Sequence, residues 1–163
     1  MNKLQADIKE LLEFDPYTID SDLKKNKLIN ILKQQIIHHI KNCDKYKRWY
    51  KSNNFISPHQ IKDYEEIPFI PSGAFKLTNL ISAENSKKIQ SSGTTSNNKS
   101  TIFIDKATSL NQTKSLSKIL SSILGKKRMH YYIVDLEPQI KSRDNTMSAR
   151  QAGMAGYLMG AKT

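Results

Sequence analysis

Cysteine is almost absent from this sequence, because Cys43 is the only one in 163 residues. A single cysteine excludes an internal disulfide framework and any zinc site built from several cysteines, and it fits a reducing compartment. Long hydrophobic runs are also missing, since no apolar stretch approaches the roughly 20 residues of a membrane span. The first residues, "MNKLQADIKELLEF", lack the apolar core of a signal peptide. We therefore expect a cytoplasmic protein with no membrane span.

Arginine is scarce in a chain that is strongly basic. The 26 Lys+Arg residues against 15 Asp+Glu residues give a net charge of +11, and most of the positive charges are lysines. A basic surface can attract nucleic acid, anionic lipid or phosphate-bearing ligands. No stripe of arginines and aromatic residues marks a nucleic-acid face, so nucleic-acid binding ranks last among the functions that fit and no nucleic-acid partner is expected.

Apolar residues at helical spacing predict two amphipathic helices in the N-terminal region, residues 1–66. The first face consists of Leu4, Ile8, Leu11 and Leu12, and the second consists of Leu28, Leu32, Ile36, Ile40 and Cys43. Ser57, Pro58 and Gln60 have the spacing of a capping box, which predicts a short third helix. The aromatic residues Tyr46, Trp49 and Tyr50 are expected to pack the helical region against the rest of the chain, with a lipid-facing role as the alternative.

The following part of the chain, residues 67–163, is expected to be richer in strands. Two prolines in "EEIPFIPSGAFK" fix an extended path and remove backbone donors, which predicts an ordered connector and not a central strand. "KKIQ" and "STIFID" are predicted strands, and "MHYYIVD" is a predicted buried strand because it is β-branched and aromatic.

A helix is predicted between Asp105, its expected N-cap, and Gly125, its expected end. Its apolar positions are Leu110, Thr113, Leu116, Leu120, Ile123 and Leu124. No repeat or linker divides the chain. The expected fold class is therefore α/β, with N-terminal helices followed by a mixed sheet with flanking helices, in a single partial domain over residues 1–163.

The stretch "SSGTTSNNKS" between the two predicted strands is typical of a phosphate-binding loop. Glycine allows a close backbone approach, hydroxyls and N–H groups donate to phosphate oxygens, and lysine adds positive charge. One alternative is a Walker A loop, but Asn98 replaces its second glycine and a strand, not a helix, follows the lysine. Another is a hydroxyl-rich hairpin loop with no ligand, because these residues also favour turns.

Four separated segments, taken in order, resemble the acyl-protein synthetase family, the ligase component of the bacterial bioluminescence fatty acid reductase, within the adenylate-forming ligases. They are "IPFIPSGAFK", "STIFIDKATSLNQTKSL", "YYIVD" and "RDNTMSARQAGMAGYLMG", which together span about residues 67–160. The loop resembles the glycine-, serine- and threonine-rich loop of adenylate-forming ligases. The N-terminal helices carry no such signature.

The resemblance implies an ATP-dependent, AMP-forming ligase that uses Mg²⁺. Such an enzyme joins a carboxylic acid, here expected to be a long-chain fatty acid, to AMP and then passes the acyl group to a protein thiol, with an acyltransferase and a reductase as partner proteins. The positions that match the family's ATP phosphate-binding loop are Ser91, Ser92, Gly93, Thr94, Thr95 and Lys99. Ser96 stands where family loops commonly have a glycine.

Length separates this chain from the family, whose catalytic domain is roughly twice as long. The catalytic residues are therefore expected in a missing C-terminal part, and the chain is expected to be the N-terminal portion of a ligase that is inactive alone. The alternative is a non-catalytic remnant or interaction module that keeps the ligase fold. A truncated core would expose apolar surface and favour self-association.

The remaining candidates are weaker. Cys43 is expected in the core and not as an acyl acceptor, and the histidines have no spacing suited to a metal. Arg143 and Arg150 are candidate contacts to substrate or phosphate, but a polar loop capped by Ser148 explains the same segment equally well. The small residues of "SARQAGMAGYLMG" fit either close helix packing or a narrow substrate wall.

Overall fold

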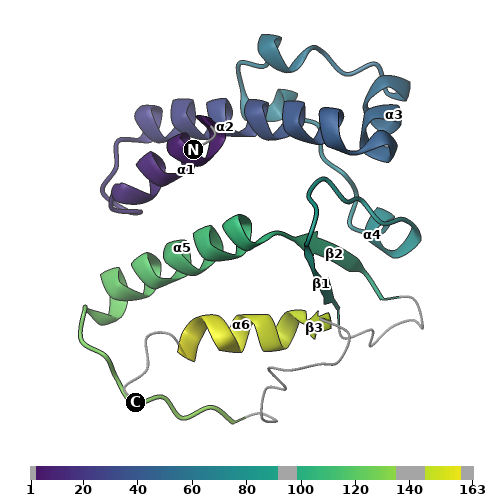
Figure 1. Cartoon of the computed structure of the whole chain (residues 1–163). Helices are drawn as coiled ribbons and strands as arrows, with labels where there is room; N and C mark the ends of the chain where they lie inside the picture. The colour runs from purple at the N-terminus through teal and green to yellow at the C-terminus, as the bar shows by residue number, and fades with distance from the viewer. Residues whose placement is uncertain (1–2, 92–98, 135–145, 159–163) are drawn as a thin grey trace. The chain divides into compact units, whose positions relative to one another are not determined.

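The chain forms two compact units, which we describe separately. The structure is a computed structural model that describes residues 3–91, 99–134 and 146–158. Unit 1 contains residues 1–71 and 80–83, and unit 2 contains residues 72–79 and 84–163. Unit 1 is helical, whereas unit 2 contains a three-stranded mixed sheet with helices (Figure 1). The predicted α/β class, with helices followed by a sheet and flanking helices, is confirmed.

Unit 1 begins with the two predicted amphipathic helices, α1 (Lys3–Glu13) and α2 (Ser21–Asn42). The Asp20 side chain caps α2 by accepting a hydrogen bond from the Leu23 N–H at 2.8 Å. Lys27 of α2 pairs with Glu10 of α1, with 2.6 Å between Nζ and Oε1. A third helix, α3 (Asp44–Ser52), follows after one residue.

That one residue is Cys43, which is buried in the core as predicted but does not lie inside a helix. Its extended backbone (φ −137°, ψ 103°) ends α2 and starts α3, so the helical spacing from Leu28 to Cys43 did not reveal the break. The rest of the core surrounds it and consists of Ile29, Ile36, Tyr46, Tyr50 and Ile61.

Aromatic rings hold the end of α3 and the following segment together. Phe55 packs against Trp49 and Tyr50, with ring centroids 5.1 and 5.4 Å apart, and Tyr46 lies 5.4 Å from Trp49. The Tyr50 hydroxyl donates to the Ile56 carbonyl at 2.6 Å, so its polar end is satisfied. Tyr46, Trp49 and Tyr50 therefore have a packing role, and the contacts that show it lie inside unit 1.

Two single-turn 3₁₀ helices complete unit 1, η1 (Pro58–Gln60) and η2 (Tyr64–Glu66). Ser57 and Gln60 form the predicted capping box, although the helix is only one turn long. Next to η2, Asp63 pairs with Lys25 of α2, with 2.5 Å between Oδ2 and Nζ. The hydrogen bond from Lys25 lowers the pKa of Asp63 to about 2. Because both side chains are exposed to water, this pair contributes little stability.

Unit 2 contains α4 (Ala74–Leu77), β1 (Lys87–Gln90), β2 (Thr101–Ile104), α5 (Lys106–Leu124), β3 (Thr146–Ser148) and α6 (Ala149–Leu158). The strand order is β2-β1-β3, with β2 antiparallel and β3 parallel to β1. Both strands predicted around the loop are confirmed, and so is the connector, which has no strand. As predicted, Asp105 caps α5 by accepting from the Thr108 N–H at 2.6 Å, and α5 ends at Gly125, whose φ of +84° suits glycine.

The prediction of a buried strand at "MHYYIVD" is wrong for its described residues, 129–134. They show no strand beyond one isolated bridge at Met129, and Tyr132 is 96% exposed. β-Branched and aromatic residues form a strand only where a neighbouring strand pairs with them, and the described sheet ends at β2 and β3. Leu110, Ile123 and Leu124, three of the apolar positions of the predicted helix, are exposed as well. None of the described helices is long and apolar enough to cross a membrane.

Burial of Tyr46 gives unit 1 a testable pH dependence. Burial raises the pKa of Tyr46 from an ordinary value of 10.0 to about 12, and the nearby Tyr50 adds to the shift. The folded state therefore holds this proton more tightly than the unfolded chain, so its contribution is complete below pH 10 and is lost between pH 10 and 12. We expect Tyr46→Phe to reduce the loss of unfolding free energy between these pH values, measured by urea denaturation. An equal loss in both proteins would contradict the assignment.

Two glycines of α6 provide a matched test of the packing between α5 and α6. A Cβ atom at Gly153 meets nothing within 4 Å, whereas one at Gly156 would lie 2.8 Å from Leu116 Cδ2. Alanine is about 0.8–1 kcal/mol better than glycine inside a helix. We expect Gly153→Ala to raise the free energy of unfolding by about that amount, and Gly156→Ala to gain less because Leu116 must move. Equal gains in calorimetry would show that the two helices do not pack closely in solution.

Candidate functional site

The ends of the predicted phosphate loop are fixed by two serines that close the β1–β2 hairpin. The Ser91 N–H donates to the Ser100 carbonyl at 3.0 Å, and the Ser100 N–H donates to Ser91 Oγ at 3.1 Å. The Ser91 hydroxyl thus accepts a bond from the hairpin, yet its own proton remains able to donate to a ligand. One residue pair away from the loop, Gln90 Nε2 donates to Thr101 Oγ1 at 3.1 Å.

The register of the sheet brings a second element to the same end. Gln90 of β1 pairs with Ser148 of β3, and the two strands are parallel. Ser91 and the first residue of α6, Ala149, therefore follow the last residue pair of neighbouring strands, at the same edge of the sheet. The N-terminus of α6 lies beside the base of the loop.

Ser148 caps α6, as one reading of this segment predicted. Its Oγ accepts from the Gln151 N–H at 3.1 Å, and its own N–H donates to Gln151 Oε1 at 3.0 Å, which forms a reciprocal capping box. The N-terminal turn of a helix carries a partial positive charge and favours anions. Arg150 lies exposed in this turn. A positively charged loop end and a helix N-terminus thus share one edge of the sheet.

Only some of the predicted site residues belong to the described part of the chain. Ser91 and Lys99 stand at the two ends of the loop, and Lys99 is exposed. Ser92, Gly93, Thr94, Thr95 and Arg143 lie outside the described residues. Arg150 is also a described candidate. It is far from the loop in sequence, and the pairing of β1 with β3 places the start of its helix, α6, at the loop edge of the sheet.

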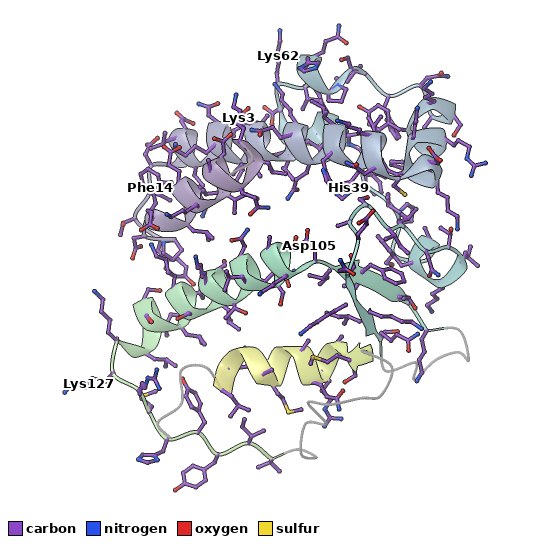
Figure 2. The ribbon with its side chains drawn as sticks, in the orientation of Figure 1. Lys3, Phe14, His39, Lys62, Asp105 and Lys127 are labelled. Carbon is purple, nitrogen blue, oxygen red and sulfur yellow. The ribbon has the colours of Figure 1, made fainter. Side chains whose placement is uncertain are left out.

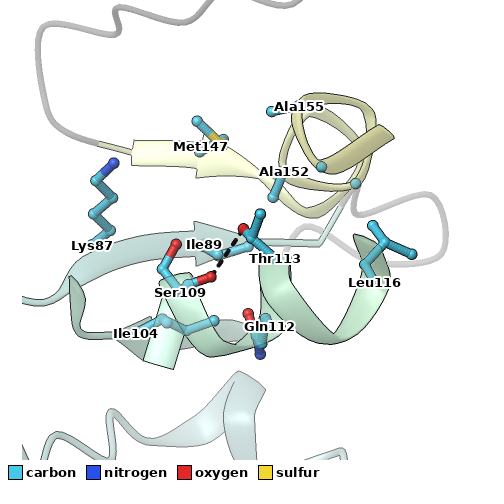
Figure 3. A pocket seen from close by; sticks show the side chains of 12 residues that line it. Lys87, Ile89, Ile104, Ser109, Gln112, Thr113, Leu116, Met147, Ala152 and Ala155 are labelled. Atoms are coloured by element: carbon cyan, nitrogen blue, oxygen red, sulfur yellow. Dashed lines mark hydrogen bonds between the residues drawn. The ribbon is translucent and has the colours of Figure 1, made fainter. Parts of the chain in front are cut away.

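An apolar cavity of about 350 Å³ lies beneath the sheet in unit 2, between the strands and helices α5 and α6 (Figure 3). Ile89 and Met147 line it from the strands, and Leu116 lines it from α5. Its lining residues are Lys87, Ile89, Ile104, Ser109, Gln112, Thr113, Leu116, Met147, Ala152, Gly153, Ala155 and Gly156. The Thr113 hydroxyl is already bonded to the Ser109 carbonyl at 3.0 Å, which makes the α5 wall less polar than its sequence suggests.

Sequence reasoning did not locate this cavity, although it recognised the small residues of α6. Ala152, Gly153 and Ala155 line the cavity, while Gly156 lies against the Leu116 side chain. The small residues therefore allow close helix packing at Gly156 and also form one wall of the cavity. Along the strands the cavity runs from the Lys87–Ile104 pair, at the end of the hairpin away from the loop, toward Ala152 and Gly153 in the first turns of α6.

Unit 1 contains a partly buried titratable group with a shifted pKa. His39 Nδ1 is 2.7 Å from Ser82 Oγ, and burial lowers the pKa of His39, with His38 adding to the effect (Figure 2). Among the residues that the structure describes, no three His, Cys, Asp or Glu side chains form a group that could hold a metal ion.

Comparison with known proteins agrees with the sequence resemblance. The model of the family described as "Acyl-protein synthetase, LuxE" matches residues 2–163. The match includes the N-terminal helices, for which the sequence offered no signature. No curated protein and no solved structure matches the chain. Because the family model covers more than half of the sequence, the chain belongs to the acyl-protein synthetase family.

Proposed function

We propose that this acyl-protein synthetase activates a carboxylic acid with ATP and transfers the acyl group to a protein thiol. In the first step a carboxylate oxygen attacks the α-phosphorus of ATP and pyrophosphate leaves, which gives an acyl-adenylate. In the second step a thiolate attacks the acyl carbonyl and AMP leaves. The observation that supports this proposal is that the base of the loop and the α6 N-terminus lie at one edge of the sheet, with an apolar cavity along the same strands.

On the ATP side, we assign the triphosphate to the loop between Ser91 and Ser100. Its donors are the hydroxyl, N–H and ammonium groups of Ser91, Ser92, Gly93, Thr94, Thr95 and Lys99. The cation of Lys99 would stabilise the charge that builds up on the leaving pyrophosphate. Arg150 and the α6 N-terminus add positive charge at the same edge. Mg²⁺, when bound, would offset the negative charge of the phosphates.

On the acid side, we assign the cavity to the apolar chain of the substrate. Its volume of about 350 Å³ falls in the range of small-molecule sites, ~300–1,000 Å³, and most of its exposed wall is apolar. An alkyl chain buried against Ile89, Met147 and Leu116 gains about 25 cal/mol for each Å² removed from water. The substrate that fits this wall best is a fatty acid, with its carboxylate directed to the loop edge.

The acyl-accepting thiol must come from elsewhere. Cys43 is the only cysteine of the chain, and it is buried in the core of unit 1. We propose that the acceptor belongs to another part of a longer gene product or to a partner protein, and that acyltransferase and reductase partners supply and use the acyl group. The groups that catalyse the chemical steps are not assigned to residues of this chain.

The proposal predicts an exchange activity that depends on Lys99. Fatty-acid-dependent exchange of labelled pyrophosphate into ATP is measured on this chain and on the longest product of its gene, each with Lys99→Ala. We expect exchange in the longer product and a loss of about 10²-fold with the substitution, because a charged transition-state contact is removed. Lys114→Ala, which removes an exposed lysine of α5, is the matched control and should exchange normally.

Exchange that Lys99→Ala leaves unchanged would contradict the assignment of the loop. If neither product exchanges pyrophosphate or binds ATP while both are folded by circular dichroism, the proposed activity is wrong. The chain would then be better described as an interaction module that keeps the ligase fold.

Filling the cavity should change the preferred acid. Ala152→Leu places three additional carbons in the cavity, so we expect exchange with a long-chain acid to fall by about tenfold or more while exchange with a short-chain acid is retained. Ala107→Leu, at an exposed position in the first turn of α5, is the matched control. Equal loss with both acids would show that the cavity does not hold the acyl chain.

A further inference from the structure

The end of α5 and the segment after it, residues 123–134, combine positive charge with exposed apolar side chains; we call them the basic–apolar segment. From Lys106 to Val134 the chain has six basic residues and no Asp or Glu, although Asp105 precedes this stretch and Asp135 and Glu137 follow it; the basic residues are Lys106, Lys114, Lys118, Lys126, Lys127 and Arg128. Three of these cations are consecutive and exposed directly after α5 (Figure 2). This stretch therefore presents positive charge with no carboxylate of its own to balance it.

The apolar side chains of the basic–apolar segment are as notable as its charges. Tyr132 is 96% exposed, Val134 is fully exposed and Ile123 is 66% exposed, with Leu124 and Ile133 also open to solvent. Single exposed apolar residues are common on protein surfaces, but five within twelve residues form a cluster along the sequence, in two groups at residues 123–124 and 132–134. Figure 1 shows the chain leaving α5 here without joining the sheet. Such a cluster calls for a partner that covers it.

A polar niche of about 220 Å³ adjoins the cluster. Lys126, Lys127 and Arg128 line it together with the Tyr131 ring and the hydroxyl-bearing Ser117 and Ser121 of α5. Cations, hydroxyls and an aromatic ring are the groups that bind a phosphate-bearing head group. The three cations by themselves could be explained by the partial negative charge at the C-terminal end of α5, which they would offset. It would not explain the exposed valine, isoleucine and tyrosine beside them.

We propose that the basic–apolar segment binds the surface of a membrane that contains anionic lipids. The cations would attract anionic head groups, and the apolar side chains would enter the boundary with the acyl chains. Nucleic acid would account for the charges but offers no apolar phase for Ile123 and Val134. The binding is peripheral, because none of the described helices can cross a membrane.

This interaction goes beyond the proposed function and does not depend on it. It would place the enzyme where sparingly soluble acyl substrates collect, yet it requires neither ATP nor catalysis. A vesicle-binding assay without nucleotide can therefore fail while pyrophosphate exchange succeeds, or the reverse.

The test is co-sedimentation of the protein with vesicles made of equal amounts of phosphatidylglycerol and phosphatidylcholine, compared with vesicles of phosphatidylcholine alone. We expect binding to the anionic vesicles at least about tenfold tighter than to the neutral ones, and weaker binding as salt rises. Lys126→Glu/Lys127→Glu should weaken it by about tenfold or more. Tyr132→Ser/Val134→Ser should do the same without changing the charge, because the inserted apolar groups are lost.

The matched control is Lys45→Glu/Lys47→Glu on α3, which changes the net charge by the same amount at exposed positions of unit 1. It should bind the anionic vesicles within about twofold of the wild-type protein. All variants are first shown to melt like the wild type. If the control weakens vesicle binding as strongly as Lys126→Glu/Lys127→Glu does, the binding depends only on net charge. That result would overturn the proposal.

Two other outcomes would also overturn it. In the first, the protein does not bind anionic vesicles but forms a dimer in analytical ultracentrifugation, and Tyr132→Ser/Val134→Ser abolishes this dimer. The segment would then be an interface between copies of the chain. The second is no vesicle binding together with tight, salt-sensitive binding of a single-stranded oligonucleotide that Tyr132→Ser/Val134→Ser leaves intact.

Discussion

The position of β1 between two strands is the constraint on which the candidate site depends. Its antiparallel pairing with β2 brings Ser91 and Ser100 together and closes the loop. Its parallel pairing with β3 places the N-terminus of α6 at the same edge, although Ser148 is far from the loop in sequence. The same pairing sets Ile89 beside Met147 above the cavity. Loop, helix end and cavity wall are thus three consequences of one set of backbone hydrogen bonds.

The two units differ in how many side chains they bury. Unit 1 buries apolar and aromatic side chains around Cys43 and Ile61, as a self-supporting core does. Among the described residues of unit 2, Thr101 and Ile104 are the buried ones, and helices α5 and α6 contribute none. Unit 2 instead keeps a cavity lined by small and aliphatic residues. Stability is therefore concentrated in unit 1, and the features suited to ligands are in unit 2.

Local signals made much of this predictable from sequence. The alternation of side chains along residues 101–104 predicted β2. Asp105 and Gly125 predicted where α5 begins and ends. The caps at Ser57 and Ser148 were predicted from the hydrogen-bonding chemistry of their side chains. Long-range features were not predictable. The cavity requires the pairing of β1 with β3, which no local pattern encodes. "MHYYIVD" has strand propensity, but propensity does not supply a neighbouring strand. The break at Cys43 was hidden because both helices continue the apolar spacing.

The central claim is that the edge of the sheet formed by the hairpin base and the α6 N-terminus holds the phosphates of ATP. Amide hydrogen exchange, measured by mass spectrometry with and without Mg-ATP, tests it most directly because it reports on backbone N–H groups at that edge. The account predicts slower exchange in peptides that cover Ser91 to Ser100 and the first turn of α6, with unit 1 unchanged. Unchanged exchange at that edge with saturating Mg-ATP, or protection confined to unit 1, would contradict it.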